Sequence, residues 1–219
     1  MHYWDFAPFR WYRPVWDYGQ ERAVIGLGIV MLGQGLYTHQ GMWFDGGRTL
    51  VPVPSQWEKY SFTVDAWFKF YNNVGGTIME SVSPNTRQWD LTFRAVNNVD
   101  WTVNGETLTT PFTFSAATDF NKWMIVQATS AKHTLLTNKL CVKMNEDPIV
   151  CQITTNTDVF YDDVTPAQPA TLIIGAGFGG FIRKIKVYDW PKMEPSMELM
   201  YKLSPQCYQF HHNQSDCHI

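Results

Sequence analysis

Short segments in which apolar and polar residues alternate follow one another along most of the chain, and this pattern limits the fold more than any other feature. In SFTVDAWFKF, residues 61–70, every second side chain is apolar, the period of two that a β-strand with one apolar face requires. Seven further segments have the same character: 75–83, 88–96, 99–105, 111–116, 122–129, 138–144 and 148–155. Strands in succession without crossover helices predict an all-β fold, a two-sheet antiparallel β-sandwich or jelly roll.

Local patterns add one hairpin and one helix to this prediction. Asn104-Gly105 lies between two strand segments and predicts a type I′ turn. Residues 194–203, EPSMELMYKL, place Pro195 in a first turn and carry a partial apolar stripe. We therefore expect one short C-terminal helix beside the strands.

The composition excludes some classes of partner. The chain has 219 residues, a net charge of −3 and no block of like charges, so nothing favours a nucleic-acid backbone as ligand. The longest apolar run, residues 23–37, is shorter than a membrane-spanning helix requires and contains four glycines. We expect this run to form a buried strand, and we expect neither nucleic acid nor a membrane as partner.

A glycine motif in TLIIGAGFGGFIRKIKVYDWPK, residues 171–192, tests for a nucleotide site. Gly175, Gly177 and Gly180 have the G-x-G-x-x-G spacing of a dinucleotide-binding turn. That turn must open a helix within a βαβ unit, whereas the residues that follow alternate as another strand. The glycines are therefore expected to allow a tight turn between two strands, while Phe178 or Phe181 fills the core.

The chain divides into three expected parts: an aromatic N-terminal arm (1–22), a β-sandwich (23–203) and a tail containing Cys and His (204–219). Prolines in the arm favour an extended segment held by its rings rather than by a hydrogen-bond ladder. Two interpretations stay open, because the arm could pack on its own domain or dock on a neighbouring subunit. The interface candidates are Trp4, Phe9, Trp11 and Trp16.

Four cysteines form two near pairs. Cys141 and Cys151 flank a predicted turn and could lie opposite each other across a hairpin, as a disulfide or as two reduced, buried thiols. Cys207 and Cys217 are expected to form a second disulfide, with pairing to another chain or metal binding as the alternatives. Asn213 begins a glycosylation sequon that would apply only to an exported chain, and no standard signal peptide is readable.

The order of the motifs resembles the laminin-G-like, or concanavalin-A-like jelly-roll, family. The segments that show this resemblance are GMWFDGG (41–47), FTVDAWFKF (62–70), FNKWMIVQAT (120–129) and the closing strand of 171–192. The resemblance covers roughly residues 40–203. It implies two packed antiparallel sheets, with Trp67 inside, and an extracellular module that binds carbohydrate, protein or lipid without chemistry. Calcium is frequent in this family, and the weak candidate ligands are Asp119, Asp162 and Asp163.

Catalytic residues are not expected. Glycoside hydrolases share the sandwich, but a retaining enzyme commonly carries two carboxylates on one strand as E-x-D-x-E, and the sequence has no such triplet. Glu80, Asp90 and Asp100 stand alone in the sequence, and no G-x-S-x-G is present. No cofactor is expected apart from calcium.

The sequence thus predicts a noncatalytic recognition module that binds carbohydrate or protein at a cell surface or in an extracellular assembly. The alternative is a structural subunit of a larger complex or filament, assembled as a homo-oligomer or with a protein partner through the aromatic arm. In that case the chain could belong to an organellar complex instead of an extracellular one. Extended segments can add to the edge of a neighbour's sheet, which gives the arm a physical route to assembly.

Overall fold

The structure is a computed structural model that describes residues 2–5, 16–17, 22–23, 30–33, 35–38, 41–53, 61–71, 75–82, 89–94, 97–134, 137–155, 170–188 and 190–192. Within these residues, two antiparallel sheets make up nearly the whole fold, as the sequence predicts. The described part contains one helix, α1 (Ala116–Asp119), which the sequence did not predict. The predicted helix over 194–203 lies outside the described residues.

The first sheet, sheet A, has ten strands. These are β1 (His2–Asp5), β2 (Trp16–Asp17), β3 (Arg22–Ala23), β5 (Gly35–Thr38), β6 (Gly41–Asp45), β8 (Phe62–Phe70), β13 (Met124–Lys132), β14 (Asn138–Met144), β15 (Val150–Thr154) and β17 (Gly179–Tyr188). Their order is β15, β14, β13, β8, β17, β1, β2 and β3, and β6 also pairs with β17 and carries β5. The two longest central neighbours, β8 and β17, therefore come from opposite ends of the sandwich sequence.

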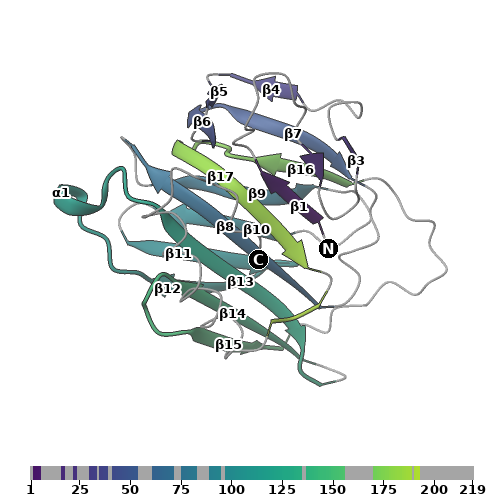
Figure 1. The fold of residues 1–219 in the computed structure, drawn as a ribbon. Helices are drawn as coiled ribbons and strands as arrows, with labels where there is room; N and C mark the ends of the chain where they lie inside the picture. Colours follow the sequence, from purple (N-terminus) through teal and green to yellow (C-terminus); the bar gives the residue numbers. More distant parts are fainter. Residues whose placement is uncertain are drawn as a thin grey trace, which may run out of the picture.

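The second sheet, sheet B, has seven strands. These are β4 (Val30–Leu32), β7 (Arg48–Val53), β9 (Gly76–Val82), β10 (Trp89–Arg94), β11 (Asn98–Val103), β12 (Glu106–Pro111) and β16 (Ala170–Ile174). Their order is β12, β11, β10, β9, β16, β7 and β4. Figure 1 shows sheet A, with β8, β13 and β17, lying in front of sheet B, so the outer face of sheet A is turned toward the viewer.

The core between the sheets is dominated by aromatic rings. Phe62, on β8, contacts Trp89 and Trp101 of sheet B with ring centroids 5.5 and 5.6 Å apart. The ring centroids of Phe68, also on β8, and Phe93 of sheet B are 4.8 Å apart. Such rings bury large apolar areas and prefer tilted or edge contacts, so the alternation that predicted β8 also supplies the cohesion of the sandwich.

Both faces of β8 are buried, which corrects the prediction of a strand with one apolar face. Thr63, Asp65, Trp67 and Lys69 point away from the core yet lie below the surface. Thr63 explains part of this, because its hydroxyl donates to the Trp190 carbonyl and accepts the backbone N–H of residue 192. Residues 190–192 therefore lie across the outside of the sheet. Trp67 is buried, but on the outer face of sheet A rather than between the sheets, where the family resemblance implies it should lie.

Two predicted turns are confirmed. Asn104 and Gly105 have φ angles of 51° and 84° and connect paired strands β11 and β12, as a type I′ turn requires. Gly175, with φ of 79°, lies in the turn between β16 and β17, where an added Cβ would meet the Phe44 ring. Phe178 from this turn is fully buried, and the chain continues as strand β17 rather than as a helix.

Two strand predictions are wrong in detail. Residues 23–37 do not form one strand, because β4 joins sheet B, β5 joins sheet A, and Gly33 between them has φ of 84°. Residues 111–116 leave the sheet after Pro111. There the N–H and hydroxyl of Thr113 donate to the Asp147 carboxylate instead of to a strand, and α1 follows.

Part of the arm is held by backbone pairing, which corrects the expectation of an arm held only by its rings. His2–Asp5 pair antiparallel with Lys184–Val187 of β17, and Trp4 pairs with Asp17 of β2. In these residues the arm packs on its own domain. The side chains of Trp4 and Trp16 and the whole of Phe9 and Trp11 lie outside what the structure describes.

Candidate binding site

A row of aromatic rings crosses the outer face of sheet A near the start of β17. Trp43 on β6 pairs with Phe181 on β17, which pairs with Lys69 on β8. Trp123, just before β13, flanks Lys69 from the other side. We call these four residues the aromatic row. Its three rings are half-buried, so each keeps part of its surface open to solvent.

Lys69 holds two of these rings in place. Its ammonium lies 4.5 Å from the centroid of the Phe181 ring and 5.1 Å from that of Trp123. Only 6% of Lys69 is exposed, and burial lowers the pKa of its ammonium. The negative faces of the two rings replace part of the water that the cation loses. The lysine is therefore the spacer that keeps the rings apart.

Trp67 lies two residues along β8 from Lys69, on the same outer face. Lys184 pairs with it, and the ammonium groups of Lys184 and Lys186 lie 5.5 and 5.8 Å from its ring centroid. Trp67 is only 4% exposed, and its indole Nε1 has no hydrogen-bond partner within the described chain. A buried donor without an acceptor is unfavourable unless another molecule supplies one.

A buried polar cluster surrounds Asp65, the next outer-face residue of β8. Lys192 forms an ion pair with its carboxylate, and the Gln127 amide donates to it at 3.4 Å. Burial raises the pKa of Asp65, against the opposing effect of Lys192 and, more weakly, of Lys186. Burial also raises the pKa of Tyr188, whose hydroxyl contacts the same carboxylate. This cluster fixes residues 190–192 on the sheet.

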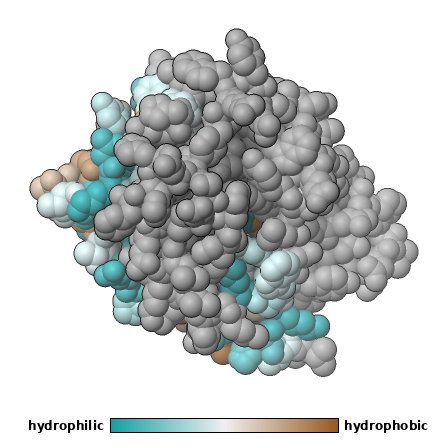
Figure 2. Space-filling view, viewed as in Figure 1, coloured by the Kyte–Doolittle hydropathy of each residue, from teal (hydrophilic) through white to brown (hydrophobic). Residues whose placement is uncertain are grey.

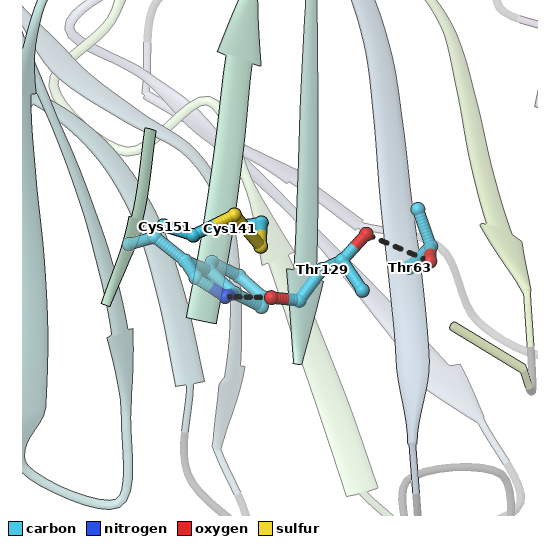
Figure 3. The surroundings of a disulfide bond; sticks show 5 residues. Thr63, Thr129, Cys141 and Cys151 are labelled. Carbon is cyan, nitrogen blue, oxygen red and sulfur yellow. Dashed lines mark hydrogen bonds between the residues drawn. A yellow bond between two sulfur atoms is a disulfide. The ribbon is translucent and has the colours of Figure 1, made fainter. Parts of the chain in front are cut away.

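The predicted Cys141–Cys151 disulfide is formed. The two cysteines are register partners on β14 and β15, with Cα atoms 4.1 Å apart. Figure 3 shows Cys141, Thr129 and Thr63 in line across neighbouring strands, with a hydrogen bond of 3.0 Å between the two threonine hydroxyls. The disulfide thus links the edge strand β15 covalently to β14, on the outer face of sheet A.

The structure brings together carboxylates that the sequence left apart. Asp90 on β10 lies directly opposite Glu80 on β9, and Asp100 follows on β11, all on the outer face of sheet B. Burial, and then repulsion from Asp90, raises the pKa of Glu80, while Arg48 opposes the rise. Burial raises the pKa of Asp90 as well. The statement that these residues stand alone is therefore wrong in space, because it considered only one strand at a time.

Two of these carboxylates already have partners on the sheet. Thr92 donates to Asp90 at 2.9 Å, while Asp100 accepts from Thr109 at 2.7 Å and forms an ion pair with Arg94. In the described ranges, no group of three His, Cys, Asp or Glu side chains could hold a metal ion. Neither fact supplies a catalytic arrangement.

The predicted calcium ligand Asp119 is engaged in its own turn. Its carboxylate accepts the Ser115 N–H at 2.8 Å and the Lys122 ammonium at 3.0 Å, and the Ser115 bond leads the causes that lower the pKa of Asp119. The other calcium candidates, Asp162 and Asp163, lie outside the described residues. So do Cys207, Cys217 and Asn213 of the tail.

On the viewed side, the described surface is mostly hydrophilic, with a small apolar area over α1 (Figure 2). That area includes the exposed Ala116 and Ala117. No helix in the described part of the chain is long and apolar enough to cross a membrane.

The sequence did not reveal the aromatic row. Its members come from four separate segments, and only the pairing of β6, β17 and β8 places them side by side. A usable indication was present in β8, where Trp67 and Lys69 share the face opposite the core. Large and charged side chains on the outward positions of a central strand point to a covered or functional face.

No protein-family model matches the sequence, and no curated protein is significantly similar to it. Solved structures share the fold at low identity. A Trypanosoma rangeli sialidase in complex with the inhibitor DANA matches with a TM-score of 0.58 and 14% identity, covering 91% of this chain but 32% of the sialidase. This chain therefore spans about a third of that enzyme.

Two binding domains are similar as well. Domain 4 of AbnA, an extracellular arabinanase from Geobacillus stearothermophilus in complex with arabinotriose, matches with a TM-score of 0.56 and 11% identity, covering 91% of this chain and 97% of that domain. The receptor binding domain of botulinum neurotoxin C/D mosaic serotype gives 0.52 and 15%, covering 80% and 46%. The likeness supports the predicted β-sandwich fold, whereas membership of the laminin-G-like or concanavalin-A-like family stays a prediction.

Proposed function

We propose that the chain is a noncatalytic recognition module that binds carbohydrate on the outer face of sheet A. The observation that carries this proposal is the aromatic row, with half-buried rings of Trp43 on β6, Phe181 on the neighbouring β17, and Trp123 just before β13, beyond Lys69 of β8. The apolar face of a sugar ring packs on such rings, and its hydroxyls bond to polar groups at their edges.

The dimensions of the row suit a short oligosaccharide. Neighbouring strands lie about 4.8 Å apart, so four strands carry the row across about 14 Å. That is comparable with a chain of two or three sugar units. The rigid sheet and the Lys69 spacer hold the rings before a ligand arrives, and preorganised groups lose little entropy on binding.

The position of one pair of carboxylates supports a binding rather than an enzymatic role. Glu80 and Asp90 are on the outer face of sheet B, on the opposite side of the sandwich from the aromatic row. A hydrolase needs its acid and its nucleophile or base at the bound sugar. The arabinanase domain seen with arabinotriose offers a precedent for a separate sugar-contacting domain on this fold.

The Cys141–Cys151 disulfide supports an oxidising compartment. We therefore place the module outside the cell or at its surface, where glycans are accessible. Assembly through the arm is less well supported, because the backbone of His2–Asp5 is already paired within the chain.

The test is saccharide binding by calorimetry with a fixed panel of arabinotriose, cellotriose, laminaritriose and sialyllactose. At least one should bind to the full chain. Trp43→Ala and Trp123→Ala should each weaken that binding about tenfold or more, because a truncated aromatic anchor costs one to several kcal/mol.

Trp190→Ala is the matched control, since Trp190 is 48% exposed but lies outside the row. It should leave the affinity within about twofold. If no saccharide binds, the carbohydrate proposal is wrong, and the face would have to recognise a protein instead. Equal losses for Trp190→Ala and Trp123→Ala would place the ligand elsewhere.

A further inference from the structure

The outer face of sheet A carries two buried polar atoms of complementary kind with no partner in the described chain. One is the indole Nε1 of Trp67, a donor, and the other is the amide Oε1 of Gln127, an acceptor. Both residues are almost fully buried, at 4% and 0% exposure. Most buried polar atoms in proteins are hydrogen-bonded, so this pair calls for an explanation.

The register places the two side chains next to each other. Trp67 of β8 pairs with Ile125 of β13, and Asp65 pairs with Gln127. Trp67 and Gln127 are therefore diagonal neighbours on one face, with Cα atoms about 7–8 Å apart, within reach of long side chains.

Asp65 decides which way the Gln127 amide turns. Its carboxylate is an acceptor in its ion pair with Lys192, so the amide nitrogen faces it, at 3.4 Å. The amide oxygen is consequently left without a donor. The indole ring is fixed as well, because the ammonium groups of Lys184 and Lys186 lie over it.

We infer that a ligand hydroxyl bridges these two atoms, accepting from Trp67 Nε1 and donating to Gln127 Oε1. A hydroxyl is the simple group that does both at once. Lys69, two residues along β8, belongs to the aromatic row, so Trp67 lies about 7 Å along the strand from the row on which the sugar would stack. The inference rests on the proposed function and names its polar contact: an uncharged sugar hydroxyl.

The experiment compares wild type with Trp67→Phe, which keeps a ring for the lysines but removes the N–H. The probe is the trisaccharide of the panel that binds most tightly, together with its monodeoxy analogues. In wild type, one deoxy position should lower the affinity about tenfold, because the buried donor and acceptor stay unpaired. In Trp67→Phe the penalty for that analogue should become smaller, because only the bond to Gln127 is left for the hydroxyl to lose.

A second measurement holds even if Trp67→Phe folds poorly. The indole N–H resonance of Trp67 should shift on saturation with the sugar, and Gln127→Met should reduce the penalty for the deoxy analogue in the same way as Trp67→Phe. An unchanged resonance overturns the inference. So does equal binding of all deoxy analogues by wild type while Trp123→Ala still abolishes affinity; the two atoms then share an ordered water only. Absence of all binding instead refutes the proposed function, and this inference with it.

Discussion

At the scale of single residues, Glu80 and Asp90 form an unfavourable pair, because two carboxylates lie directly opposite each other on neighbouring strands. Like charges directly opposite on adjacent strands destabilise a sheet by a few tenths to about 1 kcal/mol. Burial, and then repulsion from Asp90, raises the pKa of Glu80, and burial leads the rise in the pKa of Asp90. The folded chain thus binds these protons more tightly than the unfolded chain does.

Stability should therefore fall as the pH rises from about 4 through the raised pKa values of this pair. Glu80→Gln removes one of the two groups with a raised pKa and, with it, the repulsion that Asp90 exerts on Glu80. The variant should lose less unfolding free energy between pH 4 and pH 7 than wild type, by about 0.2–1 kcal/mol. Urea unfolding at several pH values measures this difference.

Glu146→Gln, in the exposed turn before β15, serves as the control and should follow wild type. If Glu80→Gln is instead less stable than wild type at pH 7 alone, the attraction between Glu80 and Arg48 outweighs the repulsion between Glu80 and Asp90. That result would contradict the assignment of this pair as a source of strain.

At the scale of elements, edge strand β15 depends on its disulfide. Among the strands that the structure describes, it pairs with β14 alone, and two of its five residues, Gln152 and Ile153, are exposed. Cys141 and Cys151 are ten positions apart in the sequence. Closing a loop of that size lowers the conformational entropy of the unfolded chain, which stabilises the folded state by about 2–3 kcal/mol. Replacing both cysteines by alanine should lower the unfolding free energy by that amount.

Reductant provides the internal control for this prediction. It should shift the urea midpoint of wild type toward that of the double variant, and it should not move the midpoint of a variant in which Cys207 and Cys217 are replaced by alanine as well. If the wild-type midpoint does not change on full reduction, β15 contributes nothing to the part of the fold that unfolds cooperatively.

Elements were largely predictable from the sequence, whereas their partners were not. Alternation in 61–70 gave the inner face of β8, and Asn104-Gly105 gave a hairpin, because both depend on neighbouring residues. The aromatic row and the Glu80–Asp90 pair depend on register between strands distant in sequence. That register includes an irregularity between Ile182 and Lys184, which no local pattern announces.

At the scale of the whole molecule, the start of the arm is a strand of sheet A rather than a free extension of it. His2–Asp5 satisfy the backbone of Lys184–Val187, on the side of β17 away from β8. Removing residues 1–20 would expose that stretch as an unpaired edge. Exposed edges recruit other strands, so the truncated chain should melt at a lower temperature and should begin to associate.

An arm that serves as an intermolecular clamp predicts the opposite result, an oligomer of the full chain that dissociates on truncation. Light scattering at several concentrations distinguishes the two outcomes. The double variant Trp4→Ala, Trp16→Ala keeps the backbone but removes two candidate interface rings. If intramolecular pairing is the role of the arm, this variant stays in the state of the full chain while the truncated chain associates. Loss of an oligomer in both would instead make the rings an interface and assembly the leading function.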